Sequence, residues 1–179
     1  MRFFRIFLVA AALMVAVPAV SSAQTRLYPA YELIELESND VSYSVFALDR
    51  DGQKHYYMDT GPVGMGGKVI KVNIDPISQL YVDLGETLEE ALETLAALQA
   101  CFDGEKNQVY DFKGSFTVLQ PKETSETIHV QYRKPLLTRY LELYADRDGV
   151  YMATQISRTD LNALVRGVKS YKKLHPKEK

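Results

Sequence analysis

The residues best suited to hold a phosphate form one glycine-rich stretch, Gly61-Pro62-Val63-Gly64-Met65-Gly66-Gly67-Lys68. A P-loop needs glycine where Pro62 stands, serine or threonine where Val69 stands, and a helix after it. The alternation that follows this stretch predicts a strand instead, which argues against a nucleotide or dinucleotide site. Two interpretations remain, a hairpin loop and a mobile binding loop with Met65 at its tip.

The chain contains two identical tetrapeptides, Asp49-Arg50-Asp51-Gly52 and Asp146-Arg147-Asp148-Gly149. Their carboxylates have the spacing found at the start of a calcium-binding loop. A complete EF-hand loop adds a third oxygen ligand before its glycine and a bidentate glutamate at its twelfth position. Those twelfth positions hold Thr60 and Ser157. We therefore interpret both tetrapeptides as hairpin turns. Their repetition also suggests a duplication, although the first copy precedes several strands and the second only one.

The chain contains three histidines, His55, His129 and His175, and one cysteine, Cys101. No two histidines stand at helical spacing and none lies in a zinc-binding pattern, so we predict neither a metal site nor a cofactor. His129 falls on the expected solvent side of a strand. Cys101 lies beside the apolar stripe of a helix, which favours a small buried thiol. A cysteine nucleophile would require the fold to deliver His129 or His55 to it.

Tyrosine is the most informative aromatic residue, because the chain contains twelve tyrosines and no tryptophan. Tyrosine suits surfaces that contact partners, and it equally suits half-buried strands, where the ring packs and the hydroxyl stays hydrated. We select a candidate contact surface from the strand tyrosines and the tip of the glycine-rich loop. Its members are Tyr56, Tyr57, Met65, Tyr140, Tyr144 and Tyr151.

Short stretches rich in β-branched and aromatic residues, separated by turn-forming residues, predict the strands that must position these side chains. Alternation is clearest at 68–74, where Ile70, Val72 and Ile74 share one face. The predicted strands are 33–36, 41–48, 54–60, 68–74, 80–84, 108–112, 115–119, 127–132, 137–144 and 150–156. Because most connections are short, we expect an antiparallel sheet.

Two segments with a period of about 3.6 residues predict amphipathic helices, over about 87–102 and 158–173. Thr87 and Glu90 form a capping-box pattern at the start of the first, and Ser157 and Asp160 cap the second. We therefore predict an α+β fold in the order strands, helix, strands, helix. Both helices are expected to cover one face of the antiparallel sheet.

The first 23 residues have the pattern of a cleavable signal peptide. Arg2 and Arg5 precede an apolar stretch, 6–17, that is too short to span a bilayer, and small residues follow at 21–23. We expect cleavage before Gln24, and no lipid anchor because that residue is not cysteine. The expected organisation is then one domain over 24–174 and a short polar tail over 175–179.

Composition places the rest of the chain among ordinary globular proteins, with 46% hydrophobic and 25% charged residues. A lone cysteine cannot form an internal disulfide, so the hydrophobic core must hold the fold. Without the two N-terminal arginines, 19 basic and 23 acidic residues remain, a net charge of −4. That mild acidity argues against a nucleic-acid partner. No second hydrophobic segment follows, so we predict no membrane span.

We expect an exported, soluble protein of the periplasm or the extracellular space that contacts an envelope protein, an extracellular protein or a ligand without catalysis. An exposed tyrosine-rich face would favour this role. Two alternatives stay open. One is a small hydrolase or isomerase whose site is assembled from distant residues, with Cys101 or His129 in a pocket. The other is a carrier that encloses an apolar ligand between the sheet and the helices.

Overall fold

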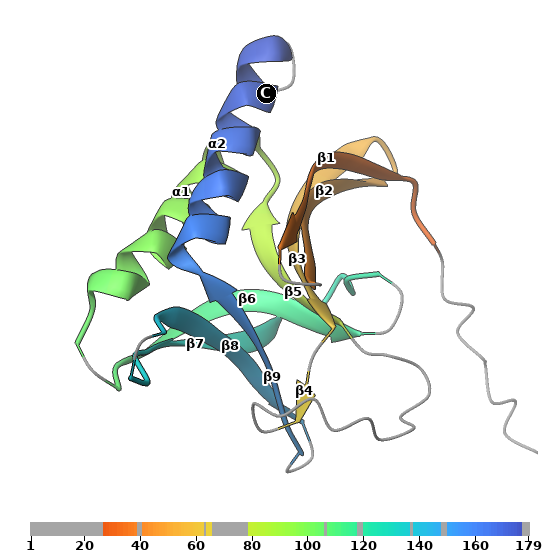
Figure 1. The fold of residues 1–179 in the computed structure, drawn as a ribbon. Helices are drawn as coiled ribbons and strands as arrows, with labels where there is room; N and C mark the ends of the chain where they lie inside the picture. Colours follow the sequence, from red (N-terminus) through yellow and green to blue (C-terminus); the bar gives the residue numbers. More distant parts are fainter. Residues whose placement is uncertain are drawn as a thin grey trace, which may run out of the picture.

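The computed structural model describes residues 27–38, 41–62, 64–65, 79–105, 107–117, 120–136, 138–147 and 150–176. Within these ranges the chain forms one antiparallel sheet and two α-helices (Figure 1), which confirms the predicted α+β class. The signal peptide expected at 1–23 and the strand expected at 68–74 lie outside the described residues. None of the described helices combines the length and the hydropathy needed to cross a bilayer.

The elements follow one another in two similar series. The first series is β1 (Ala30–Ser38), β2 (Val41–Arg50), β3 (Gln53–Pro62), β4 (Gly64–Met65), β5 (Gln79–Gly85), α1 (Leu88–Ala100) and the short 3₁₀ helix η1 (Cys101–Asp103). The second series is β6 (Val109–Thr117), β7 (Glu126–Arg133), β8 (Tyr140–Arg147), β9 (Val150–Ser157) and α2 (Arg158–Leu174). Each series therefore contains four long strands followed by a helix, and the first adds the two-residue strand β4.

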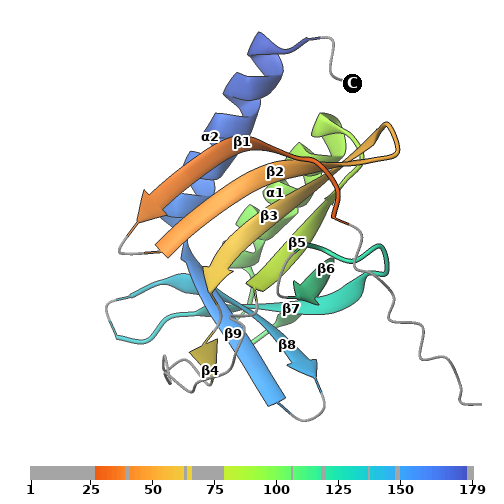
Figure 2. The same ribbon diagram turned by 90° about the vertical axis from the view of Figure 1, so that its right-hand side faces the viewer.

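The described strands form one strongly curled sheet, in the order β1-β2-β3-β5-β6-β7-β8-β9-β4. β4 directly follows β3 in the chain, yet it pairs with β9, through Gly64 opposite Ala153. The Thr154 hydroxyl also donates a hydrogen bond of 3.1 Å to the carbonyl of Thr60 at the end of β3. The sheet from β3 to β9 thus curls until its last long strand meets the end of β3 (Figures 1 and 2).

The repeated tetrapeptide occupies different places in the two series. The first copy joins β2 to β3, where Asp51 and Gly52 have φ values of 58° and 91°. The Asp49 carboxylate accepts a hydrogen bond of 2.6 Å from the Gly52 N–H, as a tight hairpin turn requires. The second copy joins β8 to β9, and its residues 148–149 lie outside the described residues. The first copy therefore forms a hairpin turn. The two copies do not mark equivalent positions of a duplicated unit.

The main core lies between the inner face of the sheet and the two helices, which pack against each other and lie on the same side of the sheet (Figure 2). α1 packs mainly on β5, whereas α2 packs mainly on β1. The largest fully buried side chains of this core are Tyr56, Met58, Leu80, Leu84, Leu88, Leu95, Leu98, Ile128, Leu141, Leu143 and Ile156. Alternation along the strands and the 3.6-residue period along the helices bring these side chains to one side.

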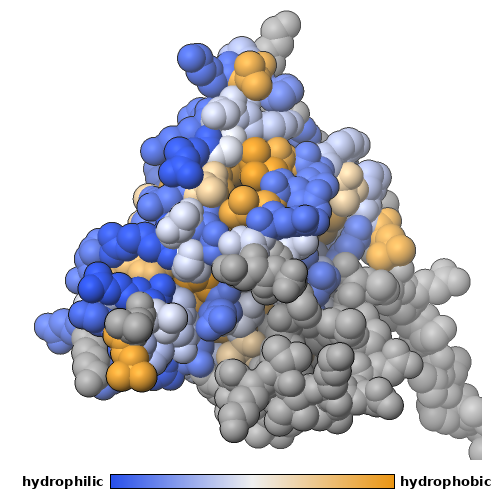
Figure 3. Space-filling model, in the orientation of Figure 1, coloured by the Kyte–Doolittle hydropathy of each residue, from blue (hydrophilic) through white to orange (hydrophobic). Residues whose placement is uncertain are grey.

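α2 approaches β1 closely because Gly167 has no side chain. A Cβ atom at this position would lie 2.6 Å from Cδ1 and 2.8 Å from Cγ1 of Ile34. Figure 3 shows apolar side chains at the surface beside α2, where β1 brings partly buried residues onto the main core. The first strand and the last helix of the described chain therefore share a tight, partly exposed contact.

Both helices begin at capping side chains. The Thr87 hydroxyl accepts a hydrogen bond from the Glu90 N–H at 3.2 Å, and the Glu90 carboxylate accepts one from the Glu86 N–H at 2.7 Å. The Ser157 hydroxyl likewise accepts from the Asp160 N–H at 3.1 Å. These bonds satisfy backbone donors that have no partner within the helix. The capping residues therefore determine where α1 begins after β5 and where α2 begins after β9.

A second, smaller cluster covers the outer face of β2, β3 and β5. It consists of buried Leu48, Tyr57 and Tyr81, with Tyr28 and Phe46 packed against them. Gln120 holds the N-terminal segment over this cluster, because its side chain bonds both the N–H and the carbonyl of Tyr28, at 2.9 and 2.8 Å. This part of the sheet is therefore buried on both faces.

Candidate functional site

Two of the predicted contact residues lie in the interior of the protein. Tyr56 points into the main core and Tyr57 belongs to the outer cluster, and each is only 2% exposed. The Arg50 guanidinium lies 5.4 Å from the centre of the Tyr57 ring, and its Nη2 donates to the carbonyls of Pro121 and Lys122. Neither tyrosine is available to a contact surface in this conformation. The helices cover the face of β3 that carries Tyr56, and the 120–123 segment covers the opposite face, which carries Tyr57.

Two of the other candidates lie on β8. Tyr140 and Tyr144 are half-buried on the outer face of β8, opposite Ser157 and Ala153. Tyr144 packs on the His129 ring, with the two ring centres 5.1 Å apart. The side chains of Met65 and Tyr151 lie outside the described residues.

Tyr140 also lines a cleft of about 550 Å³ at the end of β7. Its lining residues come from the turn between η1 and β6, from the end of β7 and the loop after it, and from the start of β8: Gly104, Asn107, Tyr132, Arg133, Lys134, Pro135 and Tyr140. The volume is that of a small-molecule or side-chain binding site. The cleft therefore lies where the turn that joins the two series meets the connection between β7 and β8.

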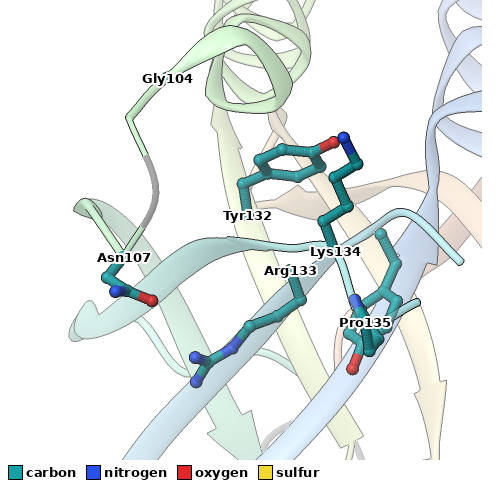
Figure 4. Close-up of a pocket in the computed structure, with 7 residues that line it drawn as sticks. Gly104, Asn107, Tyr132, Arg133, Lys134 and Pro135 are labelled. Atoms are coloured by element: carbon teal, nitrogen blue, oxygen red, sulfur yellow. The ribbon is translucent and has the colours of Figure 1, made fainter. Parts of the chain in front are cut away.

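The alternation of β7 gives the cleft two different sides. Figure 4 shows Tyr132 and Lys134 directed to one side of the strand and Arg133 to the other. The Tyr132 ring packs edge-on against Phe102 of η1, with the ring centres 5.9 Å apart. Arg133 Nε donates a hydrogen bond of 2.6 Å to the Glu142 carboxylate on the neighbouring strand. The cleft therefore wraps the end of β7, with an aromatic wall on the inner side and a fixed guanidinium on the outer side.

Two residues at the rim have a backbone conformation that is rare for residues other than glycine. Asn107 has a φ of 68° and Leu136, which directly follows Pro135, has a φ of 44°. Asparagine tolerates this left-handed region, but a bulky aliphatic residue there is an outlier. Leu136 is also 98% exposed. Strain of this kind often marks a functional loop.

The lining carries positive charge. Among the described residues Lys134 makes no ion pair, and none of the seven lining residues is acidic. Arg158, at the start of α2, lies 4.9 Å from the centre of the Phe102 ring behind the aromatic wall, where it pairs with Asp103 at 2.6 Å. The lining of the cleft therefore includes one ammonium group without an ion pair, one guanidinium that is paired with Glu142, two tyrosines and an amide. Such groups suit an anion.

A second cleft, of about 510 Å³, lies at the other end of α1 and carries the opposite charge. It contains His55 and Asp83 together with Glu86, Glu90, Asp111 and Lys113. The His55 Nε2 lies 2.8 Å from the Asp83 carboxylate, and the side chains are 19% and 13% exposed. His55 stacks on the Tyr57 ring at 4.8 Å between centres.

Several hydrogen bonds determine the ionisation of Asp83. Burial alone favours its neutral acid, but hydrogen bonds from His55 and from the Gly85 N–H, at 2.9 Å, hold its pKa below the ordinary value. The Ser125 hydroxyl donates to the same carboxylate at 3.3 Å. A serine nucleophile would instead have to donate to histidine. The arrangement has the residue types of a hydrolase triad in the wrong connectivity, with the aspartate at its centre.

The remaining chemistry-bearing residues, Cys101 and His129, line neither cleft. Cys101 is buried and donates to the Ala97 carbonyl, and burial raises its pKa to about 11. His129 pairs with Asp111 at 2.7 Å on the outer face of the sheet. No group of three or more histidine, cysteine and acidic side chains within the described ranges could hold a metal ion. Cys101 and His129 are thus not brought together.

The sequence reasoning missed six of the seven lining residues of the cationic cleft. The signal was present in 133–137, where two basic residues, a proline and two leucines stand between strands. Leucine in a connection is unusual because it finds little apolar cover there. Comparison of the chain with protein-family models, with curated proteins and with solved structures gave no match.

Proposed function

We propose that this chain is an exported, non-catalytic binding protein of the cell envelope or its surroundings, whose cationic cleft takes an anionic group from its partner or ligand. The observation that carries the proposal is the lining itself, which includes Lys134, Arg133 and two tyrosines and contains no acidic residue. Charge-assisted hydrogen bonds from such groups are about twice as strong as neutral ones.

The geometry of the cleft supports selection as well as attraction. The bond from Arg133 Nε to Glu142 fixes the plane of the guanidinium, and the packing of Tyr132 on Phe102 fixes the phenol. Groups that are already held in place lose little conformational entropy when a ligand binds. Lys134 is the one exposed, flexible cation, and we expect it to close on the bound anion.

Export is part of the same proposal and has its own test. Residues 1–23 carry the signal-peptide pattern described above, and the proposal requires their removal. The mass of the protein isolated from cells that express the full chain should correspond to a start at Gln24. An intact N-terminus on protein recovered from the cytoplasm would contradict export but would leave the cleft in place.

Titration of the isolated, isotope-labelled protein with acetate, phosphate and sulfate tests the binding site. We expect the largest amide shift changes at residues 104, 107, 132–134 and 140. Replacement of Lys134 by glutamine should weaken binding by about threefold to tenfold, and higher salt should weaken it further. The matched control is Lys169→Gln, because Lys169 is an exposed lysine of α2 that does not line the cleft.

The proposal fails if the anions leave these amides unchanged. It also fails if Lys169→Gln reduces binding as much as Lys134→Gln, because the effect would then report net charge and not the cleft.

A further inference from the structure

We infer that the anionic group in the cleft is a side-chain carboxylate from an extended acidic segment of a partner protein, which also packs an apolar side chain on Leu136. This inference rests on the proposed function of the cleft and specifies its ligand. Four features of the loop between β7 and β8 carry it.

The first feature is the exposure of Leu136. It is 98% exposed, the highest value among the exposed large hydrophobic residues of the described chain. Single exposed leucines are ordinary, but this one also adopts a left-handed φ of 44°. The fold therefore maintains an unfavourable backbone conformation in order to display an apolar side chain to solvent.

The second feature is the order of the loop around Leu136. The Thr138 N–H donates to the Pro135 carbonyl at 3.0 Å, and the Thr138 hydroxyl donates to the same oxygen at 3.2 Å. These bonds close a tight turn with Leu136 at its first inner position. The leucine is thus presented in a defined place, which lowers the entropy that a partner must remove on binding.

The third feature is continuity between the leucine and the cleft. Lys134 and Pro135 line the cleft, and Leu136 is the next residue of the chain. A free small anion would occupy the cleft and leave Leu136 in water. A ligand that uses both features must extend past the rim and carry an apolar group beside its anionic group, as a peptide segment does.

The fourth feature separates a protein from a lipid surface. The anion-binding groups line a hollow at the end of β7, which a flat bilayer surface cannot enter, whereas a side chain can. Burial of one leucine improves affinity by roughly tenfold to a hundredfold, which is too little to hold a protein of this size on a membrane by itself. A protein segment can engage the hollow and the leucine together.

The test compares four probes on the isolated protein by amide shift titration: acetate, acetyl-Ala-Leu-Glu-Ala-amide, acetyl-Ala-Ser-Glu-Ala-amide and vesicles of phosphatidylglycerol. We expect the leucine peptide to bind at least about tenfold tighter than the serine peptide and acetate. The vesicles should not retain the protein at physiological salt.

Leu136→Asn is the decisive variant, because asparagine accepts the left-handed conformation and leaves the turn intact. It should make the two peptides bind equally, without weakening acetate. Lys134→Gln should weaken all three soluble probes, and Lys169→Gln should weaken none. A melting temperature of Leu136→Asn at or above that of the parent protein would show that the turn has not been lost.

Each other outcome overturns a stated part. If Lys134→Gln weakens the soluble probes but the leucine peptide has no advantage, or keeps it in Leu136→Asn, the cleft is an anion site and the protein-segment inference is wrong. If vesicles retain the parent protein and not Leu136→Asn, the loop binds lipid and the inference is wrong. If Lys134→Gln changes nothing, the proposed function fails with it.

Discussion

Gly167 of α2 lies so close to Ile34 of β1 that a single added methyl group would overlap two carbons of the isoleucine. Glycine normally weakens a helix by about 1 kcal/mol relative to alanine. At this position the close approach to β1 outweighs that propensity. The sign of one substitution therefore tests the packing of the last helix on the first strand.

Gly167→Ala should destabilise the protein by about 1–3 kcal/mol, because Ile34 and β1 must move away from the helix. Chemical denaturation followed by circular dichroism measures this change. Combining Gly167→Ala with Ile34→Ala should cost less than the sum of the two single changes, since the second makes room for the first. A stabilising Gly167→Ala would show that the contact is looser than described.

Gly85 and Gly52 form a matched pair, with φ values of 97° and 91°. A Cβ at Gly52 would meet no atom within 4 Å, whereas one at Gly85 would lie 2.7 Å from the Glu90 Cβ. Both alanine variants should lose about 1–2 kcal/mol to backbone strain, and Gly85→Ala about 1–2 kcal/mol more through the displaced Glu90 cap. Equal losses in thermal melts would contradict the steric part of this prediction.

Asp59 and Asp83 should respond to neutralisation with opposite signs. Burial raises the pKa of Asp59 despite a hydrogen bond from the Gly61 N–H, whereas the pKa of Asp83 is lowered by His55 and Gly85. Ionised Asp59 therefore costs stability above its folded pKa, and ionised Asp83 provides stability that is lost as pH falls through its folded pKa.

At pH 7, Asp59→Asn should raise the free energy of unfolding by up to about 1 kcal/mol, and Asp83→Asn should lower it by about 1–3 kcal/mol. The difference at Asp59 should shrink as pH falls through the raised folded pKa of Asp59, whereas the difference at Asp83 should persist to lower pH, because the folded pKa of Asp83 is lowered. Urea denaturation at pH 7 and pH 3 measures them. Two changes of the same sign at pH 7 would refute the assignment.

Alkaline pH should unfold the protein through groups that are buried in their neutral forms. Burial raises the pKa of Cys101 to about 11 and those of Tyr43 and Tyr57 to about 12, and it also raises that of Tyr81. Each unfolded group ionises at lower pH than its folded counterpart, so stability is full below about pH 9 and falls as pH rises toward 11–12.

Absorbance of tyrosinate near 295 nm, recorded beside circular dichroism, measures this transition. The buried tyrosines should ionise together with loss of helix signal, and Cys101 should react with a thiol reagent only as the protein unfolds. Rapid modification of Cys101 in the folded protein at pH 8 would contradict the buried position of its thiol.

Local patterns predicted the elements well where one residue type determines the local conformation. Thr87 and Glu90 located the start of α1, and the Asp51-Gly52 turn located the hairpin between β2 and β3. These signals work because the partners lie within four residues of each other. The burial of Tyr57 could not be predicted, for the opposite reason. The cover over its face depends on the contact between Tyr28 and Gln120, which are 92 residues apart.

The cleft also could not be predicted from a local sequence pattern. Alternation shows that Tyr132 and Lys134 share a side of β7, but it does not show that the turn at Gly104 and Asn107 comes to face them. That encounter depends on the path of the chain from η1 into β6. Only the composition of the loop after β7, with leucines beside basic residues, was available as a signal.

The packing of α2 on β1 also affects the order in which the protein can fold. A chain that emerges from its N-terminus first exposes β1 long before the 17 residues of α2 are available to cover it. Because the tight Gly167–Ile34 contact joins the two ends of the domain, the last step of folding must wait for nearly the whole chain. Until then the apolar side chains of β1 lack the cover of α2, a state in which a chaperone can still bind them.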